Sequence, residues 1–340
     1  MATIKEVAKR ANVSVGTVSN VLSQSPRVNP VLRAQVQAAI RELDYHPDQV
    51  ARSLKVRQTK MLGMIISDIT NPFFPQLIRG AEDAALARGY LLVTFNTDDR
   101  IEREKQALSV LRGRRVDGIL LIVAPSKGDH THIKATLAAG VPIVCLDRLP
   151  HGIQVDSVST DHIKWAQVCV RHLLSQGHRR IAMIAGSMEL QTAQDRLEGY
   201  KAALKEARVK IDPELLREGD FRLETGHRLA KDLLLQRLRP TALFVSNGMM
   251  ALGAIKALEE TQLSCPKDIA IAVFDDLPLA GVYRPYLTSV AQPTYEIGRK
   301  GAELLIQRIE GKLTTAKPVR ILLESELNIR ESTTAKLVSP

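Results

Sequence analysis

Apolar residues recur at helical spacing in the first part of the chain. Thr3-Ile-Lys-Glu6 fits the S/T-x-x-E capping box, so we expect a helix to begin after Thr3. Ile4, Val7 and Ala8 follow at i, i+3 and i+4, which places them on one face of that helix. The pattern therefore predicts a short amphipathic helix at the N-terminus.

Two more helices are predicted in the same segment. Ala11-Asn-Val13 reads as a tight turn, and Ser14 can cap a second helix that continues to Leu22. Asn29-Pro30 combines a cap with proline at the first helical position and predicts a third helix. That helix is expected to bury the apolar residues at helical spacing, which are Leu32, Val36, Ile40 and Leu43. Two short helices joined by a tight turn and supported by a third describe a helix-turn-helix.

From Met61 onward, continuous apolar strands alternate with segments of helical period. We expect strands over residues 62–66, 91–95, 118–123, 142–146, 181–185, 242–246, 269–274 and 289–291, and near 319–329. We expect helices over residues 74–87, 102–111, 133–138, 162–175, 193–207, 224–236, 249–260 and 294–310. Unbroken apolar strands that alternate with helices indicate parallel sheets covered on both faces.

The chain is therefore expected to hold a small all-α helix-turn-helix domain and an α/β core of two lobes with parallel sheets. The predicted boundaries are residues 1–46 for the first domain, 47–60 for a connecting segment and 61–335 for the core. Lobe 1 is expected to span about 61–160 plus 291–320, and lobe 2 about 161–290 plus 321–335. Ligands of such sheets bind at the carboxyl ends of the strands, and here also between the lobes.

The charge is concentrated near the N-terminus. The chain of 340 residues has a formal net charge of +10, and its first 60 residues hold ten Lys and Arg against four Asp and Glu. The excess of +6 in less than a fifth of the length favours a polyanionic partner for this part. The alternative interpretation is a solvated basic face without a partner.

Several other classes of protein are disfavoured. The three cysteines are far apart and show no metal-ligand or disulfide spacing, so no metal site is expected. The N-terminal residues lack the apolar stretch of a signal peptide, and no apolar run could span a bilayer, so we expect a cytoplasmic protein without a membrane partner. The motifs G-x-G-x-x-G, G-x-x-x-x-G-K-[ST], G-x-S-x-G and H-E-x-x-H are absent, so no catalytic residue and no cofactor are predicted.

Motifs along nearly the whole chain resemble those of the LacI/GalR family of regulators. They occur in the family's order, and the N-terminal block, Thr3-Ile-Lys-Glu-Val-Ala with Thr17-Val-Ser-Asn-Val-Leu22, is the most specific. The later ones are Tyr45-His-Pro47, Asn71-Pro-Phe-Phe74, Val116-Asp-Gly-Ile119, Arg196-Leu-Glu-Gly-Tyr200, Phe274-Asp275 and Val290-Ala-Gln-Pro293. The resemblance implies a repressor that binds a pseudo-palindromic operator in double-stranded DNA, with a core like that of type I periplasmic sugar-binding proteins. It also implies a homo-oligomer, and we favour a homodimer because the C-terminus lacks a heptad run.

A recognition helix presents its N-terminal side chains to base edges in the major groove. The exposed candidates are Val15, Gly16 and Asn20, of which Asn20 can pair with adenine and Val15 can contact a thymine methyl group. Gly16 either permits close approach to the duplex or is a tolerated surface glycine. The residues expected to hold phosphates are Thr3, Ser14, Thr17, Ser19 and Arg33.

The segment Asp48–Lys55 resembles the family's hinge helix and is too short to be a stable helix alone in water. Two copies in a dimer would pack through Val50 and Ala51, and Leu54 would wedge into the minor groove. Lys55 would add a phosphate or groove contact. The alternative is an ordinary linker.

The effector site is expected between the core lobes. The resemblance places Arg196 at the family's ligand-guanidinium position and Asp275 at its hydroxyl-binding carboxylate. A planar guanidinium and a carboxylate suit a sugar diol or an anionic metabolite. Phe73 and Phe221, with Trp165 as either wall or core, would supply apolar walls, and the weaker polar candidates are Asp147, Thr192, Asn247 and Gln292.

Two departures from the family affect the effector. Leu190 stands where purine-binding relatives have arginine, which argues against a purine base. Gly248 stands where many relatives have aspartate, so one polar contact or cap is missing. We expect a sugar-like effector, and the alternative functions are a sugar-binding protein without a DNA role and an α/β enzyme.

Overall fold

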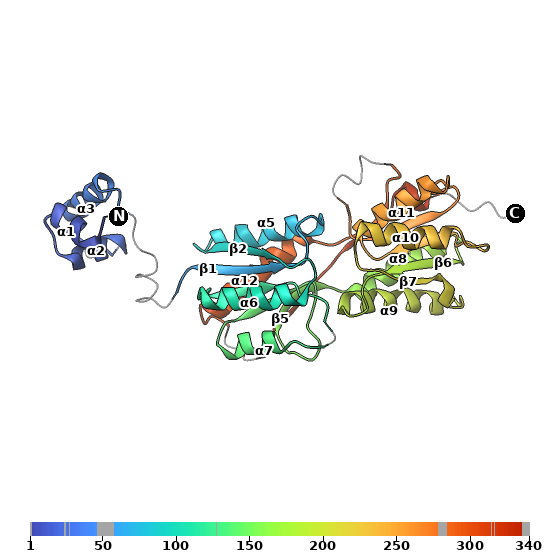
Figure 1. The fold of residues 1–340 in the computed structure, drawn as a ribbon, viewed down its shortest axis with the longest axis horizontal. Coiled ribbons are helices and arrows are strands. Elements are labelled where there is room, and N and C mark those ends of the chain that lie inside the picture. Colours follow the sequence, from blue (N-terminus) through green and yellow to red (C-terminus); the bar gives the residue numbers. More distant parts are fainter. Residues whose placement is uncertain are drawn as a thin grey trace. The chain divides into compact units, whose positions relative to one another are not determined.

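The computed structural model describes residues 2–45 and 58–334, apart from residues 24, 27, 127, 278–283, 314 and 316. The chain divides into two compact units, residues 1–59 and 60–340 (Figure 1). Among the described residues, none of the helices is both long and apolar enough to cross a membrane.

The first unit is a bundle of three helices, α1 (Ile4–Arg10), α2 (Val15–Leu22) and α3 (Pro30–Glu42). Thr3 and Glu6 form the expected capping box, and Ser14 and Asn29 cap the other two helices. The side chains that form its core are Val7, Ala8, Ala11, Val18, Val21, Val36, Ala39 and Tyr45.

One predicted core residue of α3 is wrong. Leu32 is 37% exposed, whereas Ala39 is buried in the core with Val36. Leu32 lies in the first turn of α3, one turn before the buried part of the helix begins at Val36, so its position on the apolar face does not bury it.

The second unit contains two six-stranded sheets. Lobe 1 has the strand order β11-β5-β4-β3-β1-β2, and lobe 2 has the order β12-β10-β9-β8-β6-β7. The strands of lobe 1 are β1 (Met61–Ile66), β2 (Leu91–Asn96), β3 (Gly118–Leu121), β4 (Ile143–Leu146), β5 (Asp156–Thr160) and β11 (Arg320–Leu323). Those of lobe 2 are β6 (Ile181–Ala185), β7 (Leu216–Glu218), β8 (Ala242–Val245), β9 (Ala270–Phe274), β10 (Thr288–Ala291) and β12 (Glu326–Asn328). All the pairs are parallel except β10 with β12.

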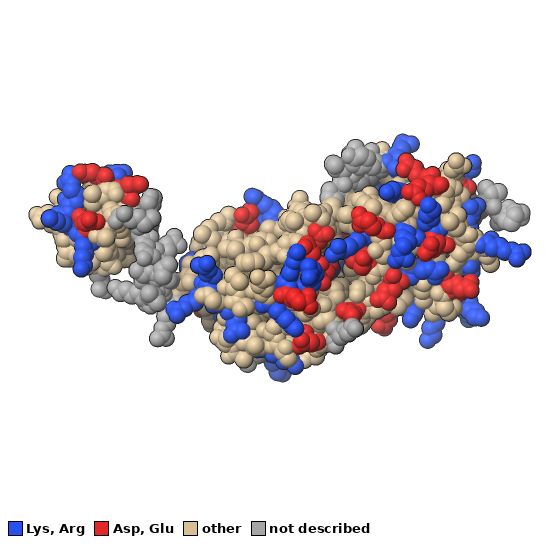
Figure 2. All heavy atoms as spheres, in the orientation of Figure 1, with Lys and Arg blue, Asp and Glu red and all other residues tan. Residues whose placement is uncertain are grey.

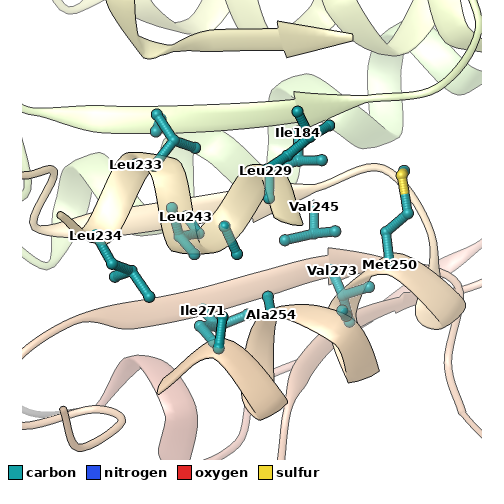
Figure 3. Packing of buried hydrophobic residues seen from close by; sticks show 14 of the residues in the cluster. Ile184, Leu229, Leu233, Leu234, Leu243, Val245, Met250, Ala254, Ile271 and Val273 are labelled. Atoms are coloured by element: carbon teal, nitrogen blue, oxygen red, sulfur yellow. The ribbon is translucent and has the colours of Figure 1, made fainter. Parts of the chain in front are cut away.

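Helices cover both faces of each sheet. In lobe 1, α5 (Phe73–Leu86) and α12 (Thr294–Ile309) pack on one face, and α6 (Ile101–Gly113) and α7 (Thr131–Ala138) pack on the other. In lobe 2, α8 (His162–Ser175) and α9 (Gln191–Glu206) cover one face, and α10 (Leu223–Leu234) and α11 (Gly248–Glu260) cover the other. Figure 3 shows the second of these layers, where Leu229 and Leu233 of α10 and Val245 of β8 belong to one buried cluster. Two short 3-10 helices, Pro213–Leu215 and Glu331–Thr333, complete lobe 2.

The predicted helices and strands of the core lie within two residues of those observed, but two strands are unpredicted. β5 has the sequence DSVST and is fully buried, yet most of its residues are polar and gave no apolar signal. β7 has only three residues, which is too short for a pattern to be recognised.

The predicted lobe boundary at residues 320/321 is also wrong. It falls inside β11, whose residues Arg320 to Leu323 all pair with β5 in the sheet of lobe 1. The chain enters lobe 2 only after residue 323, and β12 then pairs with β10. The strands expected near 319–329 are therefore β11 and β12, which lie in two different sheets.

The two signs of charge are mixed on the surface of this unit. On the face that Figure 2 shows, Lys and Arg side chains alternate with Asp and Glu side chains. No large area of one sign covers the larger unit on that face.

Candidate functional site

α2 has two opposite faces. Val18 and Val21 are buried in the core of the first unit, whereas Val15, Gly16 and Asn20 are exposed. Successive helical residues are rotated by about 100°, so Gly16 and Asn20 point away from the buried pair, and Val15 lies at the border of the exposed face. The exposed face therefore has the composition expected of a surface that reads base edges.

Gly16 is not required by the packing of its own unit. A methyl group at this position would meet only Ser14 Oγ, at an ordinary contact distance of 3.5 Å. The packing of the described residues therefore does not explain a glycine at this position.

The predicted phosphate-binding hydroxyls lie at or near the helix starts. Thr3 and Ser14 are exposed caps, and Ser14 Oγ lies 2.9 Å from Thr17 Oγ1. Ser19 and Arg33 are half-buried, and Arg33 Nη2 donates a hydrogen bond of 2.7 Å to the carbonyl oxygen of Ser25. The four hinge candidates, Val50, Ala51, Leu54 and Lys55, lie outside the described residues.

The second unit has a pocket between its lobes. Its lining residues come from the carboxyl ends of strands and the starts of helices: Asn71, Phe73, Phe74, Asp147, Arg148, Thr192, Arg196, Phe221, Asn247 and Asp275. The free space is small, about 20 Å³, which is roughly the room that one water molecule needs. Seven of the eight predicted effector residues are thus brought together, and Gln292 lines a neighbouring hollow of about 310 Å³ with Phe73 and Asp275.

Arg196 is the central cation of the pocket. Its side chain is 3% exposed, its Nη1 donates to the carbonyl oxygen of Ser246 at 2.6 Å, and its guanidinium stacks 4.0 Å from the centre of the Phe274 ring. Its Nε is buried and has no hydrogen-bond partner among the described residues. An unpaired buried N–H is costly, so this group is available to a ligand oxygen.

Asp147 is the first of two carboxylates near Arg196. Its backbone adopts φ = 60°, and its Oδ1 lies 3.3 Å from His162 Nε2 in a polar contact too poorly aligned for a hydrogen bond. Burial alone would raise the pKa of Asp147, but the contact with His162 and the charges of Arg196 and Arg148 outweigh it and lower that pKa. Asp147 is therefore held as an anion.

Asp275 is the second carboxylate, and its backbone also has positive φ, 78°. Gln292 Nε2 donates to Asp275 Oδ1 at 2.5 Å, and Thr160 Oγ1 donates to Gln292 Oε1 at 2.7 Å. Burial of the carboxylate raises the pKa of Asp275 above its ordinary value, although Arg196 and Gln292 oppose this. The residue as a whole is half-buried, and its carboxylate is the part that loses contact with water.

The pocket walls are aromatic. Phe221 has φ = 67°, and its ring packs against Gly186, where a methyl group would lie 1.9 Å from the ring. Phe73 begins α5 and meets Phe74 edge to face, with ring centres 5.1 Å apart. Flat rings of this kind suit the C–H faces of a sugar ring.

Two of the weaker candidates, Asn247 and Thr192, are buried and line the pocket. Asn247 Oδ1 accepts from the Met250 backbone N–H to cap α11, and its Nδ2 donates to the Phe221 carbonyl oxygen. The cap that Gly248 cannot supply is thus provided by Asn247. Thr192 is buried near the start of α9 and lines the pocket.

Three pocket residues were missed as site candidates, namely Asn71, Phe74 and Arg148, and so was His162, which contacts Asp147 and Arg196 beside the pocket. Arg148 follows Asp147 directly after a predicted strand, which could have indicated it, and Asn71 and Phe74 belong to a motif that the family resemblance had already identified. His162 gave no signal, because only the fold brings the start of α8 to Asp147. Trp165 packs against the α8–α9 layer of lobe 2 and Leu190 lies in its α10–α11 core, so neither lines the pocket.

Comparison with known proteins places both units. Residues 3–48 match the family model described as bacterial regulatory proteins, lacI family, and residues 170–333 match the periplasmic binding protein-like domain. The ribose operon repressor of Escherichia coli K12 is 39% identical over 309 residues, which cover 91% of this chain and 93% of that protein.

Solved structures give the same result over nearly the full length. A Lac repressor dimer bound to operator and the anti-inducer ONPF has a TM-score of 0.87 and 30% identity, and the match covers 98% of this chain and 99% of that one. The regulator CelR in complex with cellobiose has a TM-score of 0.74 and 33% identity, with coverage of 98% and 100%. The chain belongs to the LacI family of bacterial regulatory proteins, and it is a DNA-binding transcriptional regulator with an effector-binding core.

Proposed function

We propose that this protein is a repressor that binds a pseudo-palindromic operator as a homodimer and is controlled by a neutral monosaccharide bound between lobes 1 and 2. The observation that carries the effector assignment is the pocket around Arg196. A buried guanidinium with a free Nε and the carboxylates of Asp147 and Asp275 converge there, between aromatic walls.

The donor and acceptor pattern supports a sugar. A hydroxyl group can accept from Arg196 Nε and donate to a carboxylate at the same time, so adjacent hydroxyls satisfy both kinds of group. Arg148 is paired with Asp99 at 2.6 Å, and the charge of Arg196 interacts with the carboxylates of Asp147 and Asp275, which leaves little uncompensated positive charge for an anionic ligand. Leu190 lies in the core and gives the pocket no group for a purine base.

The small free space supports control by movement. About 20 Å³ cannot hold a monosaccharide, so the lobes or their side chains must rearrange when an effector enters. A ligand that prefers one lobe arrangement shifts the population toward it, which is sufficient for allosteric control.

The DNA contacts remain proposals. Asn20 and Val15 on the exposed face of α2 would read bases, whereas Thr3, Ser14, Thr17, Ser19 and Arg33 would hold phosphates. The hinge contacts by Val50, Ala51, Leu54 and Lys55 rest on the family resemblance alone. No catalytic role is proposed, because the relatives compared are regulators and each pocket acid has a role in binding.

Calorimetric titration with D-ribose and a panel of pentoses and hexoses tests the effector assignment. Ribose is the first probe because the ribose operon repressor is 39% identical to this chain. Arg196→Met should lower the affinity by roughly 100-fold, since hydrogen bonds to a buried charge contribute about 1.5–3 kcal/mol. Arg237→Met, at an exposed arginine of the same lobe, is the matched control. If no neutral sugar binds the wild type, or if Arg196→Met binds as tightly, the assignment is wrong.

A further inference from the structure

A hydrogen-bonded chain links the hinge between the lobes to the pocket. Thr160 is the last residue of β5 in lobe 1, Gln292 follows β10 in lobe 2, and Asp275 follows β9. The Thr160 hydroxyl donates to Gln292 Oε1 at 2.7 Å, and Gln292 Nε2 donates to Asp275 Oδ1 at 2.5 Å. Thr160 itself does not line the pocket, and its side chain is only 2% exposed.

The chemistry of the three groups fixes the direction of this chain. While Asp275 is ionised, its carboxylate only accepts hydrogen bonds, so the amide turns its NH₂ group toward Asp275 Oδ1. The amide oxygen then points at Thr160 and requires a donor there, and the hydroxyl is that donor. Without it, the amide oxygen of the half-buried Gln292 would lose this partner, which makes this orientation of Gln292 less favourable.

We propose that Thr160 is a positioning residue for the effector pocket: its hydroxyl holds the Gln292 amide so that Asp275 Oδ1 is occupied from the hinge side and Asp275 Oδ2 is left for an effector hydroxyl. The ligand part of this assignment rests on the proposed function. The contact joins a strand end of lobe 1 to the first residue after a strand of lobe 2, so it also connects the pocket carboxylate to the segment about which the lobes would move.

The charged groups around Asp275 make the loss of Thr160 detectable. Arg196 of α9 and His162 of α8 lower the pKa of Asp275, as does the hydrogen bond from Gln292, whereas burial and the charge of Asp147 raise it. The Arg148 guanidinium also interacts with the Asp275 charge. Because Gln292 opposes the effect of burial, releasing its amide should raise the pKa of Asp275 further.

Titration of the Asp275 carboxyl carbon by NMR, in full-length protein labelled at aspartate side chains, tests the assignment without a ligand. Asp275→Asn identifies the signal. Thr160→Val should raise the pKa of Asp275, and Thr160→Ser, which keeps the donor, should leave it at the wild-type value. Thr136→Val is the control, because Thr136 is equally buried and its hydroxyl donates to the His132 carbonyl oxygen, away from the pocket.

A second measurement examines the positioning of the ligand. Thr160→Val should weaken the binding of D-ribose, or of the sugar that binds best in the panel, by roughly tenfold, and Thr160→Ser should restore it to within about twofold. If the valine variant does not fold, Thr160→Ala replaces it and should move both the pKa and the affinity in the same direction, by less, because a water can take the place of the hydroxyl.

The outcomes separate the two proposals. If no sugar binds the wild type, the proposed effector fails and the titration still decides the role of Thr160. An unchanged Asp275 pKa in Thr160→Val and Thr160→Ala overturns the positioning role, and so does a serine variant that behaves like valine.

Discussion

At the scale of single residues, burial favours the neutral form of three histidines. Desolvation lowers the pKa of His130, His172 and His178, all in the larger unit. His178 Nδ1 lies 3.0 Å from Thr241 Oγ1, while its Nε2 is buried without a hydrogen-bond partner among the described residues. Protonation of His178 would create a buried positive charge whose Nε2–H has no hydrogen-bond acceptor among the described residues.

We therefore expect the larger unit to lose stability in mild acid. A lowered native pKa means that the unfolded chain binds more protons, so this contribution to the unfolding free energy is complete above the unfolded histidine value of about 6.5 and is lost as the pH falls through and below it. Urea unfolding at pH 7.5 and 5.5 measures the difference. His178→Gln should make this difference smaller, and an undiminished difference in that variant would show that His178 is not responsible.

At the scale of elements, helix packing in lobe 1 depends on two glycines. α5 and α12 cross where Gly80 meets the Tyr295 carbonyl oxygen and Gly298 meets the Leu77 carbonyl oxygen. A methyl group would lie 2.0 Å from the first oxygen and 1.9 Å from the second. Because both obstacles are backbone atoms, they cannot move aside as a side-chain end could.

Gly298→Ala should therefore destabilise the larger unit by about 3 kcal/mol or more, the upper range for overpacking. Gly113→Ala is the matched control, because Gly113 ends α6 and a methyl group there meets nothing within 4 Å. The control should be neutral or stabilising by up to about 1 kcal/mol. Similar denaturation midpoints for the two variants would contradict the close crossing of α5 and α12.

In α2, the substitution Gly16→Ala is expected to affect the stability of the first unit and its binding to DNA differently. Gly16→Ala should stabilise the first unit by about 0.5–1 kcal/mol, because glycine is unfavourable inside a helix and the added methyl group meets only an ordinary contact. Thermal unfolding measures this gain. If Gly16 permits close approach to DNA, the more stable variant should bind the operator more weakly in fluorescence anisotropy, whereas unchanged binding would identify a tolerated surface glycine.

At the scale of the whole molecule, a basic helical unit and a ligand-binding unit make one regulator. Most of the net charge belongs to the first 60 residues, while the larger unit mixes both signs on the face that Figure 2 shows. The polyanion-binding role therefore belongs to the smaller part of the chain.

Operator affinity should consequently depend steeply on salt. A dimer that contacts roughly six to ten phosphates loses about 10³–10⁵ in affinity between 50 and 200 mM salt. Anisotropy titrations at several salt concentrations give the slope, with a scrambled duplex as the control. A sugar-binding protein without a DNA role would bind neither duplex.

Much of the fold and site could be predicted because the signals are local. The capping box at Thr3, the proline that begins α3 and the apolar strands of the core each depend on neighbouring residues. Prediction failed where packing at a distance decides. β5 is polar but buried between β4 and β11, and Leu32 is apolar but uncovered.

The sequence alone determined the family, the two-unit organisation and most of the pocket. The order of the motifs and the hydrophobic periods were sufficient, because each of these signals depends on residues that are close together in the sequence. Only the tertiary structure decided that β11 belongs to lobe 1, that His162 joins Asp147, and that Thr160 reaches Asp275 through Gln292. Those contacts join residues more than a hundred positions apart in the case of Thr160 and Gln292. They depend on how strands cross between the two sheets, which no local pattern specifies.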